Sequence, residues 1–238
     1  MKNLIIFGLF VIALVFVQFA QAQTVDEVID KHVAALGGKD KLANLSSVYM
    51  EGVSVRNGNE ITSKTNKVQD KLYRYDVNFG AGSFTLLVTP EKGWQTNFRN
   101  GGAFESMTDE VLKGFLTQTD CAGPLVNYAA KGHKAELAGK ETIDSVECYK
   151  IKLTTKAGKE ITYWVDGKTY LVHQFSQKTM GRNGEMEVIT VYSDYKAVDG
   201  IQFPFSAELK GGGFGGGTTT YEKIEVNKPV DQKLYKPE

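Results

Sequence analysis

The sequence predicts an α+β fold in which one strongly curved antiparallel β-sheet is covered by two amphipathic helices. From Tyr149 to Val226, strand-like runs follow one another with only short turns between them. This spacing leaves no room for the crossover helices of a parallel sheet. Two segments in the first half of the chain instead show apolar residues at helical spacing on one face. A sheet this wide does not stay flat, so we expect it to curl around its helical cover.

The first 22 residues are typical of a secretory signal peptide. Lys2 gives a basic start, Leu4 to Phe19 is nearly all apolar, and Ala20-Gln21-Ala22 matches an A-x-A cleavage site. The apolar run of about 16 residues is shorter than the roughly 20 needed to span a membrane. We therefore expect export and cleavage after Ala22.

The composition of the chain excludes several classes of partner. The 28 basic and 28 acidic residues give a formal net charge of +0 and are interspersed along the sequence. No basic surface for nucleic acid and no polybasic membrane patch is expected. Without a Pro-rich or Ser-rich linker, residues 23–238 are expected to form a single domain.

The first predicted element after the signal peptide is a helix over Val25 to Leu36. Thr24 and Glu27 form a capping-box pattern, and Gly37-Gly38 supplies a stop. Apolar residues recur along it at helical spacing. This helix has one apolar face, which needs a surface to cover.

From Val48 the apolar period changes to two, which indicates β-strands. The clearest alternation places Tyr73, Tyr75 and Phe79 on one face of a strand, with Arg74 and Asp76 on the other. Two further runs follow, with Phe84 and Leu86 in the first and Trp94 and Phe98 in the second. The pattern predicts a column of large aromatic side chains along one face of the sheet.

A second amphipathic helix is predicted over Ser106 to Thr117. Leu112, Phe115 and Leu116 belong to its apolar stripe. It interrupts the strands and would add a second cover for the sheet.

The two cysteines leave two alternatives open. Cys121 follows the second helix in a turn-prone segment, and Cys148 lies in a predicted strand. An exported compartment permits a disulfide between them, whereas two unpaired thiols fit the sequence equally well.

The sequence does not predict an enzyme, a metal site or a cofactor. The three histidines fall in three different elements, without the ligand spacing of a zinc site, and no G-x-S-x-G nucleophile turn occurs. An exported hydrolase remains as a distant alternative, and it would need a cluster of perturbed carboxylates or a histidine-centred group in one pocket.

The surplus of large apolar side chains has two interpretations. Either these side chains fill an ordinary core, or the curved sheet and its helices enclose a cavity that is open to an apolar ligand. The candidate lining residues are Tyr73, Tyr75, Phe79, Phe84, Leu86, Trp94, Phe98, Leu112, Phe115, Leu116, Tyr163 and Trp164.

Four segments of the chain together carry a family resemblance: the opening helix with Gly37-Gly38, the segment Tyr163 to Val172, the segment Tyr195 to Pro204, and the closing Val226-Asn227-Lys228-Pro229-Val230. They resemble the LolA-like superfamily of periplasmic lipoprotein carriers and lipid-binding proteins. In this order they span nearly the whole chain after the signal peptide.

The resemblance implies an unclosed antiparallel half-barrel of about eleven strands, with helices on its concave side and a hydrophobic cavity between them. It implies a monomeric periplasmic carrier that holds lipid or lipoprotein acyl chains and exchanges them with a membrane-bound donor or acceptor protein. Arg56 and Arg74 are the candidates for the gating arginine of the family. A sensory or protein-interaction module with a filled core shares this fold and is the alternative.

Overall fold

The computed structural model describes residues 23–56, 58–97, 101–181, 184–211 and 216–237. The predicted signal peptide and Phe98 lie outside the described residues. Within the described part of the chain, no helix combines the length and the apolar character needed to cross a membrane.

Thirteen strands form one antiparallel sheet, as the sequence predicted, in the order β6-β5-β4-β3-β2-β1-β13-β12-β11-β10-β9-β8-β7. This is two strands more than the resemblance implied. The strands are β1 (Ser47–Arg56), β2 (Asn59–Val68), β3 (Leu72–Asn78), β4 (Ser83–Val88), β5 (Gly93–Asn97), β6 (Ala103–Ser106), β7 (Lys134–Ile143), β8 (Val146–Thr154), β9 (Glu160–Asp166), β10 (Val172–Gly181), β11 (Gly184–Val198), β12 (Ile201–Gly211) and β13 (Gly217–Val226).

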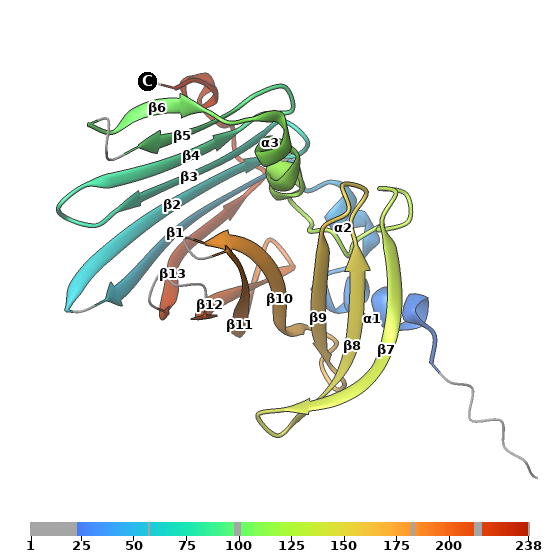
Figure 1. Cartoon of the computed structure of the whole chain (residues 1–238). Coiled ribbons are helices and arrows are strands. Elements are labelled where there is room, and N and C mark those ends of the chain that lie inside the picture. Colours follow the sequence, from blue (N-terminus) through green and yellow to red (C-terminus); the bar gives the residue numbers. More distant parts are fainter. Residues whose placement is uncertain (1–22, 57, 98–100, 182–183, 212–215, 238) are drawn as a thin grey trace, which may run out of the picture.

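The sheet curls but does not close. Its two ends, β6 and β7, each pair with one neighbour, whereas the first and last strands, β1 and β13, pair in the middle of the sheet. Strands β1 to β6 form one wing, and β7, β8 and β9 form a second wing that stands at an angle to it (Figure 1). The side of the sheet enclosed by the wings is called the inner face below.

Helix α1 (Val25–Leu36) has the predicted bounds and the predicted caps. Thr24 Oγ1 accepts a hydrogen bond from Glu27 N, Glu27 Oε2 accepts one from Thr24 N, and Gly37 ends the helix at φ 130°. Glycine is required there because the backbone is left-handed and a Cβ would lie 2.4 Å from Gly200 O. The short helix α2 (Lys39–Ala43) follows.

Helix α1 packs on the second wing and forms the larger of two apolar clusters. Val28, Ile29 and Val33 are almost fully buried among inner-face residues of β8, β9 and β10 and against Ile201 of β12. Burying each such side chain stabilises the fold by about 1.5–3 kcal/mol. This cluster anchors the helical cover on the second wing.

Helix α3 (Asp109–Phe115) covers the first wing. It begins after Thr108, whose Oγ1 accepts a hydrogen bond from Val111 N, and it continues as the 3₁₀ turn η2 (Leu116–Thr119). The helix is shorter than predicted because Ser106 belongs to β6, where it pairs with Trp94.

The C-terminal segment crosses the outer face of the first wing and ends in the 3₁₀ turn η3 (Gln232–Tyr235). Arg74 Nη1 donates a hydrogen bond to Leu234 O, and Ser47 Oγ donates one to Lys228 O. Leu87, which faces the same way as Arg74, is fully buried. Both sides of this wing are therefore partly covered.

Candidate functional site

The candidate site is the inner face of the sheet, where the two wings face each other. On the first wing Tyr73 lies opposite Val88 and Tyr75 lies opposite Leu86 across the β3–β4 pair. Helix α3 packs on these residues through Leu112, which is 8% exposed. Seven of the predicted lining residues therefore form one apolar cluster with Val88 and Met107: Tyr73, Tyr75, Phe84, Leu86, Leu112, Phe115 and Leu116.

Aromatic rings continue along the inner face from the second wing toward the middle of the sheet. Tyr163 of β9 lies 5.8 Å from Phe175 of β10, and Phe175 lies 5.5 Å from Tyr192 of β11, measured between ring centroids. Centroid separations of 4.5–7 Å are those of favourable aromatic pairs. These rings form a continuous apolar surface across three strands.

Tyrosines from distant strands of the sheet approach one another on the inner face. Strands β3 and β11 are five strand spacings apart in the sheet, which would separate them by about 24 Å if the sheet were flat. Burial nevertheless raises the pKa of Tyr73, and the neighbouring hydroxyls of Tyr75 and Tyr221 raise it further, as does that of Tyr192. The curl has brought these hydroxyls into electrostatic range across the inner face.

Five residues, Tyr73, Tyr75, Tyr163, Tyr192 and Tyr221, are called the inner tyrosines below. All except Tyr163 are half-buried, yet burial raises the pKa of each; that of Tyr221 reaches about 12. The inner tyrosines therefore lie among other protein atoms, and all except Tyr163 keep part of their surface accessible to solvent.

A lysine lies among these aromatic residues. Lys67 of β2 pairs with Tyr73 across the β2–β3 ladder, and its ammonium lies 5.6 Å from the centroid of the Tyr73 ring. Burial lowers its pKa, while Cys121 and Asp120 nearby act in the opposite direction. The inner face is thus aromatic and carries the amine group of one lysine.

The remaining predicted lining residues do not join this surface. Trp164 lies on the outer face, where its Nε1 donates a hydrogen bond to Glu141 Oε2 and Lys150 Nζ lies 5.2 Å from its ring centroid. Trp94 pairs with Leu87, which places it on the outer face too. Phe79 follows β3 and is 37% exposed.

Four polar or aromatic contributors to the inner face were missing from the sequence-based set: Lys67, Phe175, Tyr192 and Tyr221. Their signal was present as alternation along β2, β10, β11 and β13, but the sequence does not reveal which side of each strand is concave. Lys67 also follows Ser63 and Thr65 on a polar stripe, which resembles a solvated face.

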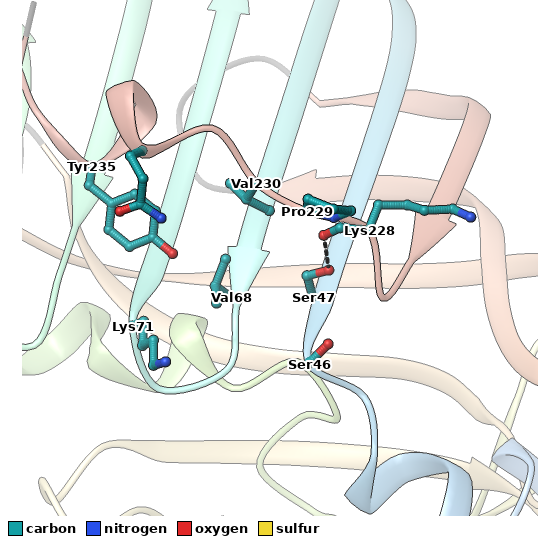
Figure 2. Close-up of a pocket in the computed structure, with 9 residues that line it drawn as sticks. Ser46, Ser47, Val68, Lys71, Lys228, Pro229, Val230 and Tyr235 are labelled. Atoms are coloured by element: carbon teal, nitrogen blue, oxygen red, sulfur yellow. Dashed lines mark hydrogen bonds between the residues drawn. The ribbon is translucent and has the colours of Figure 1, made fainter.

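The two clearest hollows of the described structure lie away from the inner face. The larger, of about 380 Å³, lies between the C-terminal segment and the ends of β1 and β2, where Pro229 and Val230 face Val68 (Figure 2). The smaller, of about 220 Å³, lies beside α2 near Asp199 and Ile201. Both are shallow, and neither combines catalytic side chains.

The reactive side chains of the described chain lie apart. Cys121 and Cys148 are buried free thiols, and burial raises the pKa of each to about 11. His32 Nδ1 lies 2.7 Å from Tyr170 O, and His133 Nδ1 accepts a hydrogen bond from Lys156 N. Among the described residues, no three metal-ligating side chains gather into a site.

The gating candidates differ in position. Arg74 lies on the outer face and pairs with Asp76, its Nε 2.9 Å from Oδ2. Arg56 lies at the end of β1, on the side of the strand that also carries Met50, and its charge lowers the pKa of Tyr75.

Comparison with known proteins gives a fold and a partial family match. No curated protein matches the chain. A family model described as an uncharacterized protein matches residues 125–238.

Solved structures match nearly the whole chain. A DUF1329 family protein of Desulfovibrio piger is 15% identical, covers 90% of this chain and 98% of its own, and has a TM-score of 0.56. A LolA superfamily protein of Nitrosomonas europaea is 12% identical with the same coverage and TM-score. A domain of Vibrio parahaemolyticus, provisionally described as an outer membrane lipoprotein-sorting protein, is 9% identical, covers 88% and 94%, and has a TM-score of 0.53. An unclosed antiparallel sheet with its helical cover is therefore shared with these proteins, and the chain has the fold of the LolA superfamily.

Proposed function

We propose that this protein is a non-catalytic periplasmic carrier or binder of lipid or lipoprotein acyl chains. In this proposal residues 1–22 direct export, and residues 23–238 act as one monomeric binding domain. The acyl chain lies on the inner face, and a membrane-bound donor or acceptor protein loads or unloads it. The fold shared with the LolA superfamily protein and with the Vibrio domain supports this assignment.

The observation that carries the proposal is the row of half-buried aromatic side chains between the wings. Phe175 and Tyr192 keep accessible surface on the inner face. Each methylene of an acyl chain that leaves water for such a surface contributes about 0.8 kcal/mol. A chain of modest length is therefore enough for stable binding.

Entry of an acyl chain requires movement of the cover on the first wing. Helix α3 has seven residues and is anchored on β4 through Leu112. A helix this short has little stability of its own, since nucleation is costly and isolated short helices are marginal. In our proposal α3 moves away from Leu86 and Val88 and exposes an apolar surface to the ligand.

The proposal is tested by native mass spectrometry of the exported protein purified without detergent. We expect an adduct with the mass of a lipid or acyl chain, and saturable binding of a fluorescent fatty acid after delipidation. The variant Phe175→Asp should bind the probe at least about tenfold more weakly, because it places a charge on the acyl surface. The variant Thr162→Asp on the outer face of the neighbouring strand β9 is the matched control. A protein that is empty and ignores the probe would refute the proposal.

A second candidate function is a sensory or protein-interaction module with a filled core. The burial of Leu86, Val88 and Leu112 in one apolar cluster beneath α3 favours it. A stoichiometric complex with one defined protein, formed equally by the delipidated protein and by Phe175→Asp, would support this function over acyl-chain transport.

A further inference from the structure

Lys67 places an amine group on the surface to which the proposed function assigns the acyl chain, so the inference drawn from it rests on that proposed acyl-chain binding. Lys67 lies near the end of β2, opposite Val48 of β1 and Tyr73 of β3. Its side chain shares the inner face with two apolar residues of these neighbours, Val48 and Met50. Lysine ammonium groups are strongly hydrated, and those removed from water are normally paired with an anion.

No carboxylate of the described chain pairs with Lys67. Asp120 lies near enough to favour the charged ammonium. Its Oδ2, however, pairs with Lys131 Nζ at 2.5 Å, and its Oδ1 accepts a hydrogen bond from Ala122 N. Among the described residues the ammonium of Lys67 has the ring of Tyr73 as its polar contact and forms neither an ion pair nor a hydrogen bond. The amine of Lys67, whose pKa burial lowers, thus lies on the inner face without a counter-ion among the described residues.

The inner tyrosines add hydroxyl groups with free hydrogen-bonding capacity. Burial raises the pKa of Tyr75, and Ser63, which lies near its hydroxyl, lowers it. The hydroxyls of the other four inner tyrosines have no hydrogen-bond partner among the described residues. None of these hydroxyls is a fully buried atom, so each can donate a hydrogen bond to a ligand that carries an acceptor.

We propose that Lys67 binds the carboxylate of a fatty acid, that the hydroxyl of Tyr73 is a neighbouring donor, and that the acyl chain lies along the inner tyrosines. The single negative charge of a carboxylate matches the single unpaired ammonium. A phosphate monoester carries up to two negative charges near neutral pH. It would leave the second charge without a partner on an aromatic surface, which is costly.

The test compares ligands that share one chain and differ in the head group. Palmitate, hexadecanol and hexadecyl phosphate are titrated, below their aggregation limits, into the delipidated full-length exported protein. We expect palmitate to bind about tenfold or more tightly than hexadecanol, the factor expected of one charge-assisted hydrogen bond. We expect hexadecyl phosphate to bind no more tightly than palmitate.

Two substitutions on β2 test whether the preference for palmitate over hexadecanol comes from Lys67. Lys67→Met keeps the length of the side chain and removes the charge, so it should reduce palmitate affinity to that of hexadecanol and leave hexadecanol affinity unchanged. Lys64→Met is the matched control, because Lys64 lies on the same strand, is exposed and faces the other way. It should change neither affinity. Circular dichroism establishes that each variant is folded, and Lys67→Gln replaces Lys67→Met if the latter is not.

The outcomes separate this inference from the function on which it rests. Equal binding of palmitate and hexadecanol by the unsubstituted protein and by Lys67→Met would overturn the inference and leave acyl-chain binding intact. A clear preference for hexadecyl phosphate that Lys67→Met abolishes would overturn the carboxylate assignment. Binding of none of the three ligands would overturn the proposed function itself.

Discussion

The two tryptophans and the five inner tyrosines occupy opposite faces of this sheet. Trp94 and Trp164 lie on the outer face, whereas the inner tyrosines lie between the wings. On the outer face, Trp164 Nε1 donates a hydrogen bond to the carboxylate of Glu141, which also forms an ion pair with Lys150. Intrinsic tryptophan emission consequently reports on the side of the molecule that does not contact the proposed ligand.

Fluorescence should therefore distinguish the two faces. We expect palmitate to change the tryptophan emission of the unsubstituted protein little, because neither indole faces the inner surface. The variant Phe175→Trp, with its indole between Tyr163 and Tyr192, should show a saturable shift of its emission maximum. A titration in which the unsubstituted protein responds as strongly as the variant would place the ligand elsewhere.

His32 makes the stability of the protein depend on pH. It is 4% exposed, and burial lowers its pKa below 6.5, although the contact with Tyr170 O partly offsets this effect. The unfolded chain binds a proton at this histidine before the folded chain does. Its contribution to stability is therefore complete above about pH 6.5 and is lost as the pH falls through and below that value.

The variant His32→Gln tests this dependence. Chemical denaturation at several pH values should show that the unsubstituted protein loses more unfolding free energy between pH 7 and pH 5 than the variant does. Between pH 8 and pH 9 the two proteins should show parallel slopes, since this histidine does not titrate there. Identical losses between pH 7 and pH 5 would exclude His32 as the cause.

At the scale of elements, the two helical covers differ in how firmly they are held. Helix α1 has twelve residues, a complete capping box and four buried side chains, including Val28 at 0% exposure. Helix α3 has seven residues and one buried side chain, Leu112. Of the two helices, α3 is therefore expected to require less free energy to detach from the sheet than α1.

Substitution of Leu112 should release α3 selectively. Leu112→Ala is expected to destabilise the packing of α3 by about 2–4 kcal/mol through loss of buried volume. Hydrogen exchange of the α3 amides should accelerate while that of the α1 amides does not. Val111→Ala on the same helix is the control, because Val111 is 43% exposed. Equal acceleration in both helices would show that they unfold together.

The sequence predicted the elements better than the site. Helix α1 was predicted with its bounds, because its caps and its apolar spacing agree. The strands β6 and β7 were not assigned individually, because β6 has four residues and β7 is largely charged and is interrupted by the register shift between Leu137 and Lys140. Strand periodicity placed Tyr163 and Trp164 on opposite faces but gave no sign of which face is concave. That depends on the curl of the whole sheet.

At the scale of the molecule, the open sheet has two free edges. Strand β7 is the longer one, and its exposed side chains include Lys134 and Glu136. Charges and bulges on edge strands hinder pairing with a second copy of the chain. These charges therefore allow a sheet with an open edge to remain monomeric, as the proposed function requires.

Removal of these charges should promote association. The double variant Lys134→Val/Glu136→Val makes the β7 edge more apolar, and we expect it to form dimers or larger species in size-exclusion chromatography with light scattering. Lys178→Val/Glu185→Val removes an exposed ion pair from two interior strands and serves as the control. If both double variants associate to the same extent, general hydrophobicity and not the free edge would be responsible.

The pairing of β1 with β13 also determines when the molecule can be completed during synthesis. The two strands come from opposite ends of the chain, and their ladder joins strands β2 to β6 to strands β7 to β12. Each of these two groups consists of sequential hairpins, which form from local contacts. The joint between them has to wait for the last residues to emerge from the ribosome, so a growing chain remains in two separate, unjoined halves until translation is almost finished.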